Sequence, residues 1–144
     1  MTKERPDHHD AEIVLRLYEL RREPVIRQSR DLIAQKFWPK SYEDVIALAQ
    51  FDNPLNAAYR QVGSYWEMAY GMVKHGIVHA GYFLESSGEG LFLFAKVEPY
   101  LERLRADTAP GSFRNAEWVA RECPEGRPMF DSISARVKRI AAAR

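Results

Sequence analysis

The sequence has one cysteine, four histidines and no long hydrophobic run, and each shortage excludes a class of protein. Cys123 has no partner for an intramolecular disulfide, and one cysteine cannot form a cysteine-based metal cluster. No stretch approaches the roughly eighteen apolar residues that a membrane span requires. The 21 basic and 20 acidic side chains leave a net charge of +1, which offers no argument for nucleic acid. We therefore expect neither a membrane segment nor a nucleic-acid partner.

What remains is the composition of an ordinary globular protein. Of the 144 residues, 46% are hydrophobic and 28% are charged, which is typical of one soluble domain spanning residues 1–144. Residues 1–9 are charged and polar, so we expect them to form a disordered tail. They also lack the apolar core of a signal peptide. With the single cysteine, this favours a cytoplasmic location.

The clearest pattern predicts a long central helix over about residues 54–75. Apolar residues recur there at spacings of three and four, which places them on one face of a helix, and a second apolar row lies beside the first. A helix that is apolar over more than half its circumference must be covered by neighbours. We therefore predict an all-α, single-domain bundle of seven or eight helices around this one.

Proline, glycine and capping residues divide the rest of the chain into helices. Asp10 is the expected N-cap of a first helix, and Pro24 separates that helix from a second one. Gly76 is expected to end the central helix in a left-handed conformation. Ser112 is the expected cap of a helix that contains Trp118.

Residues 77–97 allow two interpretations. Two short, aromatic-rich segments flank a glycine-containing loop, a pattern that also fits a β-hairpin and an α+β fold. As helices, the second segment would extend from Leu91 to Arg105, because an apolar row continues through Pro99, which would mark a kink or a restart. An isolated hairpin is marginally stable and the helical row is long, so we favour two helices.

No set of residues predicts catalysis, a metal site or a cofactor. His75 and His79 have the spacing of two metal ligands on a helix, but Gly76 lies between them as the expected helix end. Cys123 precedes a proline, and nothing beside it would activate a thiol. Glu67 is the most interesting carboxylate, and if it is covered it must be paired, with Arg103 or Arg105 as the expected partner.

The aromatic residues of the central helix suggest binding instead. Tyr59, Trp66 and Tyr70 form a row that is wide enough to leave some apolar surface for a partner. Our first hypothesis is a non-enzymatic helical module for protein–protein interaction or self-association, as a homodimer. The alternative is a small-ligand-binding protein whose pocket beside the central helix is lined by Trp66, Tyr70, His75 and Tyr100. A third hypothesis, an enzyme, would require Glu67 to meet His75 or His79 in a cleft.

The order of these features resembles a family of small, uncharacterised bacterial helical domains of unknown function. Three features carry the resemblance: the helix junction at 20–25, the end of the long helix at 73–78, and an amphipathic segment at 101–105 followed by aromatic residues around Phe113 and Trp118. The resemblance covers about residues 12–122. It implies an all-α fold and transfers no catalytic residue. Some proteins of this type carry an N-terminal membrane segment, which this sequence lacks.

Overall fold

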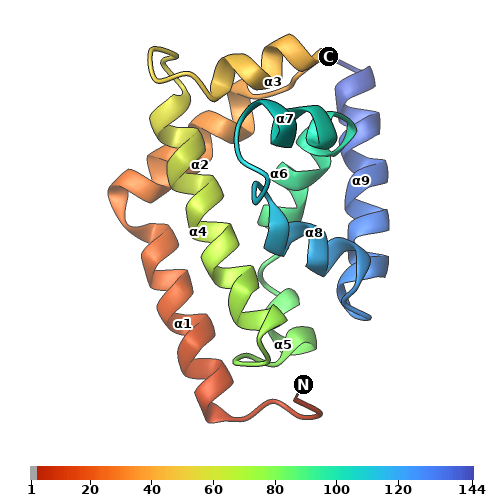
Figure 1. Cartoon of the computed structure of the whole chain (residues 1–144). Helices are drawn as coiled ribbons and strands as arrows, with labels where there is room; N and C mark the ends of the chain where they lie inside the picture. Colours follow the sequence, from red (N-terminus) through yellow and green to blue (C-terminus); the bar gives the residue numbers. More distant parts are fainter. Residues whose placement is uncertain (1–2) are drawn as a thin grey trace.

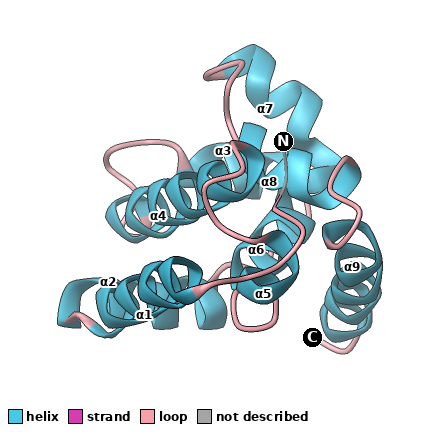
Figure 2. Ribbon diagram, turned by 90° about the horizontal axis from the view of Figure 1, so that it is seen from below, coloured by secondary structure: helices cyan, strands magenta, loops and turns pink. Residues whose placement is uncertain are grey.

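The computed structural model describes residues 3–144, and over this range the fold is all-α, as the sequence predicted. Figure 1 shows the helices in chain order, and no strand occurs among the described residues (Figure 2). None of the helices in this range is long and apolar enough to cross a membrane. The helices are α1 (His8–Arg22), α2 (Pro24–Lys36), α3 (Tyr42–Leu48), α4 (Asn56–Lys74), α5 (Ala80–Leu84), α6 (Glu89–Val97), α7 (Leu101–Asp107), α8 (Arg114–Arg121) and α9 (Gly126–Ala142), with a 3₁₀ turn at Glu98–Tyr100 between α6 and α7.

Helix α4 is the predicted long helix, and it organises the fold. It packs against α2, α6 and α8, while α9 packs against α6 and α8 (Figure 1). Its buried side includes Trp66, Tyr70 and Val73, each at most 2% exposed. One continuous hydrophobic core runs from α1 to α9 through these residues. The apolar width of α4 therefore reflects contacts with several neighbouring helices.

The segment 77–97 forms two helices, so the hairpin alternative is wrong. Leu91, Phe94 and Val97 lie on α6 at spacings of three, and all three are fully buried. A 3₁₀ turn at Pro99 separates α6 from α7, because proline has no amide hydrogen to continue the α-helical bonding. This break divides one expected helix into two, so the described residues contain nine α-helices where the sequence predicted seven or eight.

The ends of α4 and α1 show where local rules succeed and fail. Gly76 has φ 70°, and the Ile77 amide donates to the Met72 carbonyl across this turn, so the predicted left-handed end is confirmed. Helix α1 begins earlier than expected, with Asp7 as its N-cap in place of Asp10. Its first residues, His8 and His9, belong to the segment expected to be a disordered tail, of which residues 1–2 lie outside the described range.

Candidate functional site

The four residues predicted to line a ligand pocket do not come together. Trp66 and Tyr70 lie in the core, with ring centroids 5.4 Å apart. His75 is exposed just beyond the end of α4, whereas Tyr100 lies in the 3₁₀ turn between α6 and α7. Tyr100 lines a surface depression with Tyr42 and α7. The expected pocket is therefore corrected to a buried aromatic pair and two separate surface residues.

Two residues of the aromatic row, Trp66 and Tyr70, do not form the expected interaction surface, because α6 covers them. The Trp66 indole donates to Glu89 at 3.2 Å, and Glu89 forms two hydrogen bonds with the Arg30 guanidinium of α2, at 2.8 and 3.0 Å. The Tyr70 hydroxyl accepts from the Leu91 amide, and burial raises its pKa. Every polar group of this cluster thus has a partner, which is what allows the aromatic residues to be buried.

An exposed apolar groove lies instead between α1 and α4, with a volume of about 550 Å³. Its most exposed apolar side chains are Leu15 (61%), Met68 (46%) and Leu20 (39%). A groove in which exposed apolar side chains are bordered by charged residues is a feature of interaction sites. We call it the α1–α4 groove; it is lined by Glu12, Ile13, Leu15, Arg16, Leu17, Glu19, Leu20, Met68 and Met72.

Buried polar contacts hold α1 at the edge of this groove. The Tyr65 hydroxyl of α4 donates to the Leu17 carbonyl at 2.7 Å. The Arg21 guanidinium lies 5.3 Å from the centre of the Trp66 ring, and Arg21 is only 7% exposed. These contacts place the inner side of α1 against α4 and leave Leu15 on the outer side. The apolar groove is therefore a defined surface between two fixed helices.

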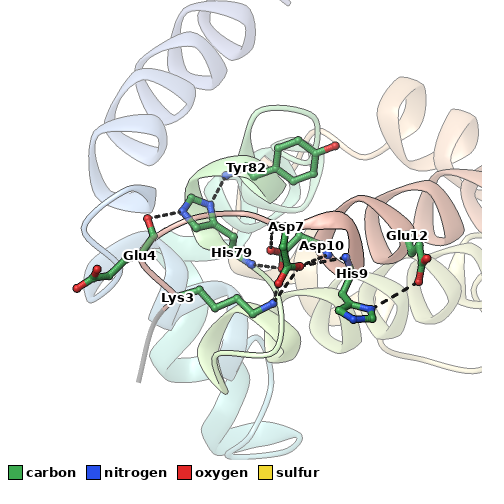
Figure 3. Close-up of polar contacts among 8 residues, drawn as sticks. All are labelled: Lys3, Glu4, Asp7, His9, Asp10, Glu12, His79 and Tyr82. Atoms are coloured by element: carbon green, nitrogen blue, oxygen red, sulfur yellow. Dashed lines mark hydrogen bonds and ion pairs between the residues drawn. The ribbon is translucent and has the colours of Figure 1, made fainter.

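A buried carboxylate fixes the start of α1 (Figure 3). Asp10 is fully buried and accepts hydrogen bonds from the Asp7 amide, the His79 amide and Lys3 Nζ, at 2.8, 2.8 and 3.0 Å. Burial alone would raise the pKa of Asp10, but these three donors stabilise the anion and lower the pKa to about 2. The bond to His79 joins α1 to the turn before α5, 69 residues along the chain.

Glu67 has a structural role that differs from the expected one. Its two carboxylate oxygens accept from the Asn115 and Ala116 amides, at 2.9 and 2.8 Å. Both amides lie in the first turn of α8, so a residue of α4 supplies the cap predicted for Ser112. The expected partner Arg105 instead pairs with Glu117, at 3.2 Å. Glu67 therefore caps α8 and does not form the expected ion pair with Arg105.

The remaining candidates for chemistry are also held apart. His75 is exposed, whereas His79 caps α5 by accepting from the Tyr82 amide at 2.9 Å (Figure 3). These histidines therefore do not converge with Glu67. Cys123 is buried, and burial raises the pKa of its thiol. Within residues 3–144, no three His, Cys, Asp or Glu side chains are arranged to hold a metal ion.

Lys96 is an unusual buried cation on α6. It is 4% exposed, its Nζ lies 4.0 Å from the centre of the Trp38 ring, and it donates to the Ile33 carbonyl at 3.4 Å. Burial lowers its pKa to about 8, with a further contribution from the nearby Arg144 guanidinium. The aromatic surroundings stabilise the charged form by cation–π contact, which explains how a lysine is retained here with no carboxylate partner among residues 3–144.

Comparison with known proteins places the chain in a family. The family model for a domain of unknown function, DUF4760, matches residues 6–123, which is most of the chain. The chain belongs to the DUF4760 family. The predicted resemblance to an uncharacterised domain family is thus confirmed. Searches of curated proteins and of solved structures found no match to this chain.

Two features of this DUF4760 domain escaped the sequence analysis. Leu15 lies two residues before the buried Leu17 and therefore on the opposite side of α1, and this spacing was the available sign that Leu15 is exposed. Gly63 lies in the middle of α4, where glycine is unfavourable. This glycine was the available sign in the sequence of a surface pocket beside α4. Met68 carried no such sign, because methionine is common both in cores and at binding surfaces.

Proposed function

We propose that this DUF4760 domain is a non-enzymatic helical module that self-associates through the α1–α4 groove. The observation that supports it is the exposure of Leu15, Leu20 and Met68 together on one continuous apolar surface. Covering this surface would remove apolar area from water, which is the main driving force of association. Trp66 and Tyr70 of the aromatic row first suggested for this role are buried, so the proposed interface lies instead at the edge between α4 and α1.

The charges at the groove favour a second copy of the chain as the occupant. Glu12, Arg16 and Glu19 follow one another along α1 beside the apolar residues, so the rim carries both signs. In a two-fold symmetric dimer, each Arg16 can face an acidic residue of the other copy. The net charge of +1 also means that two copies have little overall repulsion. The charges along α1 are therefore complementary to those of a second copy in a two-fold symmetric dimer.

Sedimentation equilibrium over a wide concentration range tests this proposal. We expect a dimer that is insensitive to a metal chelator and that Leu15→Glu abolishes, because the charge would be buried at the interface. Val25→Glu is the matched control, since Val25 is 53% exposed on α2, outside the groove. As monomers, both variants should have an unfolding free energy within about 0.5 kcal/mol of that of the monomeric native protein. A strict monomer at all concentrations, or a dimer that tolerates Leu15→Glu, would refute the proposal.

A cytoplasmic location and a bacterial origin complete the proposal. Cys123 is a buried, unpaired thiol, which suits a reducing compartment. The bacterial origin follows from the resemblance in the order of helices. Cell fractionation with an antibody to the native protein would test the location, and recovery in a secreted fraction would contradict it.

A further inference from the structure

A second opening lies beside α4, away from the α1–α4 groove. It has a volume of about 200 Å³ and faces the loop that leads into α8. Drug-sized ligands occupy cavities of about 300–1,000 Å³, so this pocket suits a smaller molecule. We call it the Gly63 pocket; it is lined by Tyr59, Arg60, Gly63, Ser64, Glu67, Gly111, Ser112 and Phe113.

Gly63 is the residue that keeps this pocket open. Glycine weakens a helix interior, and close packing is its usual explanation. Packing explains Gly90, where an added Cβ would lie 2.6 Å from the Tyr70 ring, and Gly71, where it would lie 3.0 Å from Asn115. At Gly63 an added Cβ would meet no atom within 4 Å. Internal packing therefore gives no reason for glycine at 63, whereas a larger side chain would occupy the pocket.

Two charged side chains line the pocket, the cation Arg60 and the anion Glu67. One amide of α8 donates to each oxygen of Glu67, so the negative charge of this carboxylate is partly offset by α8. Arg60 donates only its Nε, to Asn56 at 2.8 Å, which leaves the two terminal nitrogens of the guanidinium without a hydrogen bond among the described residues. These two nitrogens form the fork that binds a carboxylate through paired hydrogen bonds.

The other wall of the pocket is aromatic. The rings of Tyr59 and Phe113 contact each other, with centroids 6.3 Å apart. Burial raises the pKa of Tyr59 to about 12, so its hydroxyl stays a donor at neutral pH, and no described residue accepts from it. Phe113 has φ 60°, an unusual backbone conformation for a phenylalanine, and it turns the loop into α8 beside the pocket.

We propose that the Gly63 pocket binds a small aromatic carboxylate, with its ring against Tyr59 and Phe113 and its carboxylate on Arg60. We infer a negatively charged ligand because the terminal nitrogens of Arg60 make no hydrogen bond among the described residues. We infer an aromatic ligand because the rings of Tyr59 and Phe113 line the pocket. The size follows from the pocket volume. This site is separate from the α1–α4 groove, so it can be present whether or not the protein dimerises.

Titration of the full chain with benzoate, followed by amide chemical shifts in NMR, tests this inference. We expect saturable shifts at Gly63, Ser64 and the 111–113 loop. Benzylamine, which has a similar ring and the opposite charge, should cause no saturable shift there, because Arg60 repels it and the Glu67 oxygens are held by the α8 amides. Benzoate shifts confined to other parts of the chain, or equal effects of benzylamine at these residues, would overturn the proposal.

Variants on α4 separate a real site from adventitious binding. Gly63→Leu should abolish benzoate binding by filling the pocket, whereas Ala57→Leu, at an exposed position of the same helix, should leave it unchanged. Arg60→Met should weaken benzoate at least about tenfold, because a charge-assisted pair is lost, and should leave neutral benzyl alcohol unaffected. Arg60→Met keeps the test decisive if Gly63→Leu does not fold. Unchanged benzoate affinity in a folded Gly63→Leu or Arg60→Met protein would refute the site.

Discussion

Helix α4 has two apolar sides, of which one is buried and the other is partly exposed to solvent. On the side that faces α6, Trp66 is 2% exposed and Tyr70 is fully buried. On the side that faces α1, Met68 is 46% exposed and borders the α1–α4 groove. The difference does not come from hydrophobicity, since the exposed Met68 has no polar hydrogen-bonding group, whereas the buried Trp66 and Tyr70 each have one. It comes from the neighbours, because α6 reaches the aromatic side through Gly90, whereas α1 lies beside Met68 without covering it.

The largest expected effect tests the covered side. Trp66→Ala should reduce the free energy of unfolding by about 3–5 kcal/mol, because it leaves a cavity and removes a donor to Glu89. Met68→Ala should reduce it by less than about 1 kcal/mol, since nearly half of that side chain is already in water. Urea unfolding monitored by circular dichroism measures both. Equal losses for the two variants would mean that the two sides of α4 do not differ as described.

A smaller effect concerns the position of α1, which forms one wall of the groove. Asp10→Asn should lower the unfolding free energy on the order of 1–3 kcal/mol, because buried donors lose their charged acceptor. Asp31→Asn, at an exposed position of α2, is the control and should have almost no effect.

The same carboxylate predicts a pH dependence. The pKa of Asp10 is about 2 in the folded protein and about 4 in the unfolded chain, so its contribution to stability is complete above pH 4. That contribution should be lost as the pH falls from about 4 to about 2. Thermal unfolding of the native protein and of Asp10→Asn should therefore converge in this range. A constant difference between them down to pH 2 would contradict the role given to Asp10.

The smallest effect concerns α8, which also packs against α4. Glu67→Gln should lower stability by about 1 kcal/mol, because glutamine has one acceptor oxygen where the two α8 amides bind the two oxygens of Glu67. Glu102→Gln, on the exposed surface of α7, is the matched control. Amide hydrogen exchange should show faster exchange at Asn115 and Ala116 in Glu67→Gln only. Protection of these amides equal to that of the native protein would show that Glu67 does not cap α8.

The sequence by itself determined the helices and several of their ends. Pro24, Gly76 and Pro99 act through the backbone of their own or adjacent residues, so their effects can be predicted without knowledge of distant contacts. The same is true of the wide apolar surface of α4, which required an all-α fold with several neighbours. The order of these helices in the sequence also predicted a resemblance to an uncharacterised helical family, and the family match confirms it.

Only the tertiary structure decided which surfaces and side chains are available for binding. Whether Trp66 or Met68 is covered depends on where α6 and α1 lie, and whether Glu67 is free depends on the amides of α8, 48 and 49 residues away. The sequence predicted a ligand pocket at Trp66 and Tyr70, which are buried, whereas the structure has a pocket at Gly63 and Arg60. Local spacing places a residue on a face of its helix, but burial and pairing arise from contacts between segments that are distant in the chain.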